Sequence, residues 1–265
     1  MERSIPLSVE KKAKTYLNLG LLMAVVLFCF LYLNVNVGDI VTALPNLVGF
    51  LVDNFMPPNF TNLGVYMGAV MDTILFAIVG TYISAFLAFT FGILMSEAMM
   101  PNPWVRGLVR FFISFLRNIP VLIWASLLIF VFGIGNMVGL IALILATVGF
   151  LSRSYAESIN EIAGSKLESL RASGAGWWQI LFHGLIPEFI PSWMNWTLFS
   201  FEINIRASAI LGTVGAGGLG ILIQTNLNMR NFTEAAALIV ILVAMVLLTE
   251  AAVSLLRKRL SIGGH

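Results

Sequence analysis

Charged residues are scarce in this 265-residue chain. Asp, Glu, Lys and Arg together make up 11% of it, whereas about a quarter of the residues of a soluble domain are charged. Hydrophobic residues make up 59%, and the mean hydropathy is +0.94. This composition excludes a soluble globular protein and indicates an integral membrane protein. The formal net charge of only +2, with no basic cluster among aromatic residues, argues against a nucleic-acid partner.

Residues that form disulfides or bind metals are equally rare. Cys29 is the only cysteine and lies in an apolar run, which excludes a disulfide framework and thiol–metal schemes. His183 and His265 are far apart in sequence, without acidic partners at metal-ligand spacing. The chain also lacks a GxxxxGK[ST] segment that would hold a nucleotide phosphate. We therefore expect no metal site in this chain and no ATP bound by it.

Long apolar runs dominate what remains. At ~20 apolar residues per helix, the chain has room for about half a dozen membrane-spanning helices, and we predict an all-α integral membrane fold with six of them. The first run is long for a signal peptide and has no small-residue cleavage site, so it is predicted to be an uncleaved span. The predicted spans are residues 17–35, 65–95, 112–132, 134–152, 189–212 and 233–256.

The segments between the spans give the predicted orientation. Of the 15 Lys and Arg residues, all except Arg206 and Arg230 belong to segments on the same side as the N-terminus. The excess of basic residues in cytoplasmic segments of membrane proteins then places both termini in the cytoplasm. The predicted segments are tails at 1–16 and 257–265, an external loop at 36–64 with interfacial pieces at 40–52, a polar joint at 97–110, a cytoplasmic loop at 153–188 and a short helix at 219–228.

The longest polar run contains loop 153–188. Its first part, residues 155–170, has the pattern of a short amphipathic helix broken at Gly164. Gly174 and Gly176 then indicate a sharp turn, which small residues allow. Pro187 marks the entry into the next span. Two interpretations stay open, namely a rigid element held by a soluble partner and a structured loop that only contacts water.

The span 189–212 carries charges that lipid penalises, and such residues are functional candidates. Glu202 and Arg206 are four residues apart and share one helix face. They form either a salt bridge that fixes helix packing, a passage in which Arg206 meets an anion, or a gate. Asn204 lies on another face, and Ser208 continues a small, polar stretch toward the next segment.

Glycines crowd the segment 212–220, which cannot be a stable transmembrane helix in lipid. Irregular backbone at membrane depth is tolerated where it is buried in protein or lines a cavity. Close packing of glycines against a neighbouring helix is the competing interpretation. Both interpretations place this segment near the centre of an assembly.

The spacing in loop 153–188 resembles the EAA loop of bacterial ABC importer permeases. Glu168, Gly174 and Pro187 match its glutamate, glycine and proline. The chain departs from the motif at Ser169 and Leu170, where two alanines are usual, at Gly184, where isoleucine is usual, and at Ile186, where leucine is usual. The resemblance implies an ATPase-coupling loop that includes Glu157, Glu161, Glu168, Ala172, Gly174 and Pro187.

The run FEINIRASAILGTVGAGGLG at 201–220 is similar to the permease subunits of phosphonate-type ABC importers, whose relatives also carry phosphate esters, phosphite or hypophosphite. The run RNIP at 117–120 before Trp124 and Ala125 resembles the same family, and the likeness extends from about residue 72 to the C-terminus. It implies a type I importer permease core at 65–256 with an additional N-terminal helix. The implied translocation pathway or gate comprises Arg117, Asn118, Glu202, Asn204, Arg206, Ser208, Gly215, Gly217 and Gly218.

The resemblance also implies a transport subunit with no catalytic residues and no cofactor of its own, which is not expected to be an enzyme. It further implies partners in a bacterial cytoplasmic membrane. These are a second permease subunit, identical or a paralogue, two cytoplasmic ATPases that bind ATP and magnesium, and an external substrate-binding protein. A permease for methionine or another small solute is the alternative within this class. An ion-coupled secondary transporter and a non-transporting scaffold are alternatives of other classes, although the chain has no convincing internal repeat of the kind that secondary transporters show.

Overall fold

The computed structural model describes residues 9–34, 36–162 and 165–262, and the regular elements in these ranges are all helices. The predicted all-α fold is confirmed for this part of the chain. In chain order the helices are α1 (Val9–Tyr32), α2 (Val37–Phe55), α3 (Leu63–Met95), α4 (Pro103–Asn118), α5 (Val121–Phe132), α6 (Asn136–Ile162), α7 (Ser165–Ala172), α8 (Trp177–Gln179), the π-helix η1 (Ile180–Leu185), α9 (Ile186–Gly212), α10 (Gly218–Asn228) and α11 (Phe232–Ile262).

The chain divides into two compact units, residues 1–56 and 57–265. The first unit contains α1, which includes the apolar stretch Lys14–Tyr32, and α2. Helix α2 differs from the predicted loop with short interfacial pieces, because it is one continuous helix of 19 residues. Its first turn is capped by Asn36, whose side chain accepts a hydrogen bond of 3.0 Å from the Gly38 amide.

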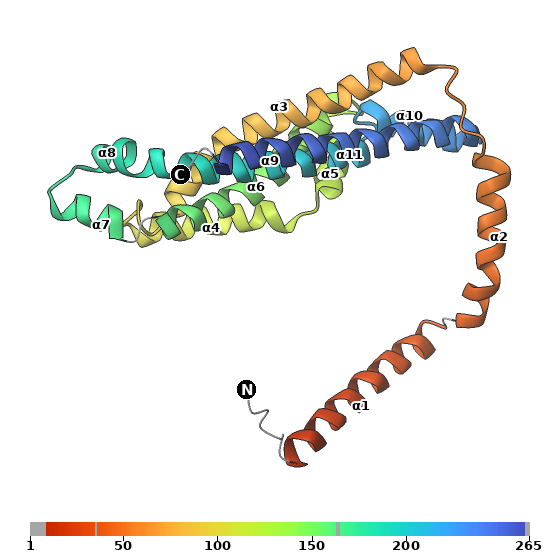
Figure 1. Cartoon of the computed structure of the whole chain (residues 1–265), viewed down its shortest axis with the longest axis horizontal. Coiled ribbons are helices and arrows are strands. Elements are labelled where there is room, and N and C mark those ends of the chain that lie inside the picture. Colours follow the sequence, from red (N-terminus) through yellow and green to blue (C-terminus); the bar gives the residue numbers. More distant parts are fainter. Residues whose placement is uncertain (1–8, 35, 163–164, 263–265) are drawn as a thin grey trace. The chain divides into compact units, whose positions relative to one another are not determined.

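Helices α3, α6 and α9 pack against one another in the second unit (Figure 1). Small residues bring α3 close to α6. A Cβ atom on Gly80 would come within 2.7 Å of the Leu143 side chain, and one on Gly92 within 2.9 Å of the Tyr155 side chain. Small residues at helix contacts are typical of membrane bundles, where close backbone approach replaces the hydrophobic effect as the source of association.

The predicted span 112–132 is not a single helix. The chain bends by 91° between α4 and α5, because Pro120 disfavours helical backbone at the residue before it and Ile119 adopts an extended conformation. Helix α4 also begins earlier than predicted. Asn102 caps it by accepting a hydrogen bond of 3.0 Å from the Trp104 amide, and Pro103 occupies the first turn.

Two further elements differ in length from the prediction. Helix α6 continues to Ile162, so the residues from Tyr155 onward are its last turns rather than the start of a separate amphipathic helix. Gly164, where a helix break is predicted, lies outside the described residues, and α7 begins at Ser165. Helix α9 begins at Ile186, with Pro187 in its first turn.

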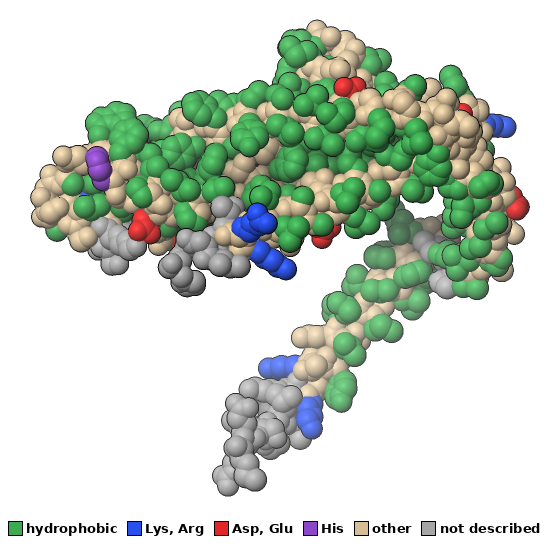
Figure 2. All heavy atoms as spheres, turned by 45° about the horizontal axis from the view of Figure 1, so that its top comes forward, with side chains coloured by type: hydrophobic (Ala, Val, Ile, Leu, Met, Phe, Trp, Pro, Cys, Tyr) green, Lys and Arg blue, Asp and Glu red, His purple; other side chains and the backbone are tan. Residues whose placement is uncertain are grey.

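In the described part of the chain, four helices are long and apolar enough to cross a membrane, or five if the bent pair α4–α5 counts as one span. Helix α9, predicted as a span, is not among them. With Glu188, Glu202 and Arg206 it carries more charge than α3 does. Six spans therefore stay a prediction. Hydrophobic side chains nevertheless cover much of the visible surface of the bundle (Figure 2).

Candidate functional site

The described helices of the polar loop pack against one end of the bundle. Helices α7 and α8 lie at one end of the bundle, and α5 and α10 lie at the other (Figure 1). Buried Leu167 of α7 and Ile180, Leu181 and Leu185 of η1 belong to the same hydrophobic cluster as Tyr155 of α6. Helix α7 and η1 are therefore packed into the core of the bundle.

Gly174 ends helix α7 in a conformation that favours glycine. Its φ is +85°, a region in which other residues cost about 1–2 kcal/mol. The Gly174 amide donates to the Arg171 carbonyl at 3.0 Å, and the Ala175 amide donates to the Leu170 carbonyl at 3.1 Å. This pair of bonds is the Schellman motif. The predicted sharp turn is thus confirmed at Gly174, whereas Gly176 has an extended backbone with a φ of −70°, which other residues also adopt.

The other residues predicted for the coupling loop are spread along it. Glu157 forms an ion pair of 2.7 Å with Arg153 on α6, and Glu161 is exposed one turn further along. Ala172 is exposed in the last turn of α7, and Pro187 is exposed at the start of α9. The side chain of Glu168 lies outside the described residues, so its predicted role stays a prediction.

Leu170 and Gly184, two residues at which the chain departs from the EAA motif, pack against each other. A Cβ atom on Gly184 would come within 2.6 Å of the Leu170 side chain and 3.0 Å of the Leu167 side chain. The large residue at 170 thus occupies the space that a larger residue at 184 would need. An exchange of this kind conserves volume across the contact, and packed cores tolerate such exchanges best.

We expect Gly184→Ile alone to lower the thermal unfolding midpoint of the purified protein, because overpacking a core costs about 1–3 kcal/mol. Adding Leu170→Ala should restore most of the loss, and Leu170→Ala alone should be destabilising because it opens a cavity. The check is a double-mutant cycle on the unfolding midpoints. Additive losses would show that the two positions do not share this space.

A short joint between α3 and α4 connects the loop to the membrane helices. The Arg171 guanidinium donates to the Ala98 carbonyl, and the Trp177 indole donates to the Met99 carbonyl at 2.9 Å. The Asn160 carbonyl oxygen on α6 accepts hydrogen bonds from the Ser96 hydroxyl at 2.7 Å and from the Glu97 amide at 2.9 Å. These bonds attach both the loop and α6 to the joint 96–100.

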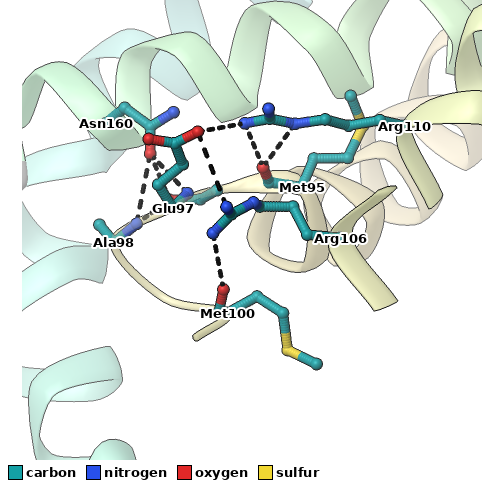
Figure 3. A network of polar contacts seen from close by, with 8 residues as sticks. Met95, Glu97, Ala98, Met100, Arg106, Arg110 and Asn160 are labelled. Atoms are coloured by element: carbon teal, nitrogen blue, oxygen red, sulfur yellow. Dashed lines mark hydrogen bonds and ion pairs between the residues drawn. The ribbon is translucent and has the colours of Figure 1, made fainter. Parts of the chain in front are cut away.

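Arginines of α4 complete this network, as Figure 3 shows. Arg110 donates to the Met95 carbonyl at 3.1 and 3.2 Å and contacts the Glu97 carboxylate at 3.3 Å. Arg106 lies 4.0 Å from the same carboxylate and donates to the Met100 carbonyl at 3.3 Å. The joint 96–100 is therefore bonded to α4 and α6 as well as to the α7–α8 loop.

Sequence reasoning missed this joint as a site. The signals available were Asn160 in a polar helix end and the Asn102–Pro103 cap, which fixes where α4 starts. Neither signal predicts which residues come together at the joint. The residues that bond to Asn160, for example, are more than 60 positions away in the sequence.

The predicted pair on α9 is confirmed. The Arg206 guanidinium and the Glu202 carboxylate form an ion pair one helical turn apart. The Glu202 side chain is 14% exposed, whereas the Arg206 side chain is 49% exposed. The acidic partner is thus largely buried, and the basic partner extends to the surface of the chain, where it can meet another molecule.

Asn204 and Ser208 lie on the opposite, buried side of α9. The Asn204 amide donates to the Thr81 hydroxyl of α3 at 2.8 Å and accepts from the Thr147 hydroxyl of α6 at 2.9 Å. The Ser208 hydroxyl donates to the Ile205 carbonyl at 2.9 Å. In this conformation Asn204 links α9 to α3 and α6 through hydrogen bonds. A role of Asn204 and Ser208 in the translocation pathway stays a prediction.

The glycine segment folds back onto its own chain. Gly215, Gly217 and Gly218 have φ values of +90°, +87° and +67°, and a side chain on Gly217 or Gly218 would collide with α6 or α3. The Thr73 hydroxyl of α3 accepts a hydrogen bond of 2.9 Å from the Leu219 amide and so caps α10. Of the two interpretations left open, the structure favours close packing for these glycines.

Arg117 and Asn118 lie at the bend between α4 and α5, and both are exposed. The Arg117 backbone packs on α6, where a Cβ atom on Gly149 would come within 2.9 Å of the Arg117 amide nitrogen. Arg117 lines a cavity with Arg110 and Arg153, and Arg206 is not part of that lining. The structure therefore divides the predicted pathway residues among at least two places.

The fold and these sites define a class, namely multi-pass α-helical membrane proteins with a structured polar loop packed into one end of the bundle. Residues 88–262 match the family model of the binding-protein-dependent transport system inner membrane component. The chain belongs to this family.

Two relatives and one solved structure show the range of similarity. The phosphate-import permease protein PhnE of Mycolicibacterium smegmatis is 32% identical over 242 residues, which cover 91% of this chain and 45% of that protein. The chain thus spans about half the length of this relative. The phosphite transport system permease protein PtxC of Stutzerimonas stutzeri is 30% identical over 234 residues, which cover 88% of this chain and 85% of that protein.

The solved structure is an inward-facing conformation of the MetNI methionine ABC transporter. One of its chains matches with a TM-score of 0.68 and 23% identity, covering 75% of this chain and 97% of that chain. At this identity the match shows a shared fold. The relatives by sequence are transport permeases rather than enzymes.

Proposed function

We propose that this chain is the transmembrane permease subunit of an ATP-driven importer for phosphonate or a related phosphorus oxyanion or ester. The observation that carries the proposal is the similarity, over about nine tenths of the chain, to permeases named for phosphate import and phosphite transport. The segment FEINIR at 201–206 of α9 also supports the proposal. Its Arg206 is exposed at the surface of the chain, where its guanidinium can contact an anion.

The α7–α8 loop supports a coupling role. Closure of a cytoplasmic ATPase would push on the exposed turn at Gly174, and the contacts of Arg171 and Trp177 would carry that motion to joint 96–100. Exposed Trp178 beside this turn, with 66% of its surface accessible, offers apolar area for a partner. The ATP energy would then act here as a bias between inward- and outward-facing states.

The proposed assembly contains a second permease subunit, two ATPases that bind ATP and magnesium, and an external substrate-binding protein. The proposed orientation puts both termini and the α7–α8 loop in the cytoplasm, as the distribution of Lys and Arg predicts. In Figure 1, α11 runs back toward the end of the bundle that carries α7 and α8, which agrees with this orientation.

Arg206 is the proposed contact for the anion. We expect Arg206→Ala to lower the uptake of methylphosphonate or phosphite more than Arg206→Lys does, because lysine keeps the charge but not the bidentate fork. Uptake of radiolabelled substrate into proteoliposomes that contain the whole transporter is the measurement. Near-normal uptake by both variants would make Arg206 a packing residue.

The buried partner requires its own control. In Arg206→Ala the largely buried Glu202 loses its ion pair, and an uncompensated buried charge is itself destabilising. The double variant Glu202→Gln with Arg206→Ala removes that charge. If Arg206 contacts the anion, uptake stays low in the double variant. Recovery of uptake would instead assign the pair a structural role.

A permease for methionine or another small solute is the second candidate. The observation that favours it is a similarity of 30% identity over 190 residues to the probable D-methionine transport system permease protein MetI of Pasteurella multocida, whereas the relatives that match over about nine tenths of the chain favour a phosphorus compound. Competition for uptake between phosphite and methionine in the same proteoliposomes separates the two candidates.

A further inference from the structure

A groove between α4 and α6 gathers positive charge outside the Glu202–Arg206 pair. It encloses about 300 Å³, a volume at the small end of ligand pockets. Each helix contributes residues spaced i, i+3, i+4 and i+7, which is one face of an α-helix. The polar lining of this α4–α6 groove comprises Arg110, Ser114 and Arg117 from α4 and Arg153, Glu157 and Asn160 from α6.

The arginines of the groove are only partly neutralised. Arg153 pairs with Glu157, and Arg110 contacts Glu97 outside the lining. The Arg117 guanidinium makes no hydrogen bond or ion pair with the residues that the structure describes. Three arginines therefore face one glutamate in the lining, and that glutamate offsets only part of their mutual repulsion.

The apolar floor of the groove raises the positive electrostatic potential that these arginines create. Ile113 and Met95 in the lining are 1% and 5% exposed, so apolar side chains form its base. Such walls keep water from screening the guanidinium groups as fully as at an open surface. Guanidinium forks match the oxygens of a tetrahedral oxyanion two at a time, and hydrogen bonds between ionised groups are the strong ones.

We propose that the α4–α6 groove binds a phosphate-type oxyanion through Arg117 and Arg153. The ligand is either a free ion or the headgroup of an anionic phospholipid, since both present the same tetrahedral phosphate oxygens. This site goes beyond the proposed function, because it lies away from the Glu202–Arg206 pair that the proposed function assigns to the transported anion. Its ligand would bridge α4 to α6 next to joint 96–100.

Arg117→Gln is the cleanest test, because it removes the positive charge without breaking a described side-chain contact. The full chain is placed in nanodiscs of phosphatidylcholine, and inorganic phosphate is titrated by calorimetry. We expect Arg117→Gln to weaken phosphate binding at least about tenfold, the equivalent of one charge-assisted hydrogen bond. Arg117→Lys should lose less, and Arg259→Gln, an exposed arginine on α11, should bind as the wild type does.

A second arm identifies the source of the ligand. The same proteins are placed in nanodiscs that contain phosphatidylglycerol, and bound lipid is counted by native mass spectrometry. If phosphate does not bind but phosphatidylglycerol is retained in an Arg117-dependent way, the ligand is a headgroup. If neither phosphate nor phosphatidylglycerol binding depends on Arg117, the proposal is overturned. Binding is measured without transport, so a failure of the phosphonate importer proposal would leave this result unchanged.

Discussion

Gly174→Asp is expected to abolish uptake while the protein still inserts and folds. The φ of +85° at Gly174 is required by the Schellman bonds that end α7. A Cβ atom there would meet nothing within 4 Å in this chain, so the folded permease has room for a side chain. The loss of uptake would therefore come from the turn's contact with the ATPase. Substrate uptake and monodispersity in detergent, measured on the same preparation, test this prediction.

Two matched variants control for the backbone. Gly133 at the end of α5 also has a positive φ, +76°, and open space at its Cβ position, so Gly133→Asp applies the same change away from the loop. It should leave uptake largely intact. Gly174→Asn keeps the size of aspartate without the charge, and asparagine tolerates the left-handed region better than most residues. Equal uptake by the wild type and Gly174→Asp would end the coupling argument.

Gly220→Ala is expected to have the largest effect on folding. A Cβ atom on Gly220 would overlap the Ala209 carbonyl oxygen of α9 and come within 2.8 Å of the Gly212 Cα atom. Backbone atoms cannot move aside as a flexible side chain can, so α10 would have to separate from α9. Since overpacking costs typically 1–3 kcal/mol and occasionally more, we expect a loss of at least about 3 kcal/mol.

The measurement is the fraction of detergent-solubilised protein that elutes as a monodisperse peak, together with its thermal midpoint. Gly68→Ala on α3 is the control, because a Cβ atom there meets nothing within 4 Å and alanine favours helix more than glycine does. A stable, monodisperse Gly220→Ala protein would contradict the close approach of α9 and α10.

Local features of the fold could be predicted from the sequence. The apolar runs place most of the long helices, and the four-residue spacing of Glu202 and Arg206 gives their ion pair. The sequence points to special backbone at glycines 174, 215, 217 and 218, and each of them has a positive φ. These features depend on a few neighbouring residues, so a local pattern is sufficient to find them.

Features that depend on distant partners could not be predicted. The spacing of Gly212 and Gly220 is compatible with a cavity lining or with close packing, and only the contact between α9 and α10 decides between them. The reach of α6 to Ile162 likewise depends on its packing against joint 96–100 and α7, through Asn160 and Ile159. The same limit applies to Glu157, predicted as an ATPase contact but paired with Arg153 at the α4–α6 groove.

The central claim is that this chain works as a permease coupled to a separate ATPase. The most direct measurement is purification of the tagged chain from native membranes in mild detergent, with mass spectrometry of the proteins that accompany it. We predict an ATPase subunit in a one-to-one ratio with the permease, lost in Gly174→Asp and retained in Gly133→Asp. A wild-type chain that purifies without any ATPase, even in the mildest detergent that extracts it, would contradict the account.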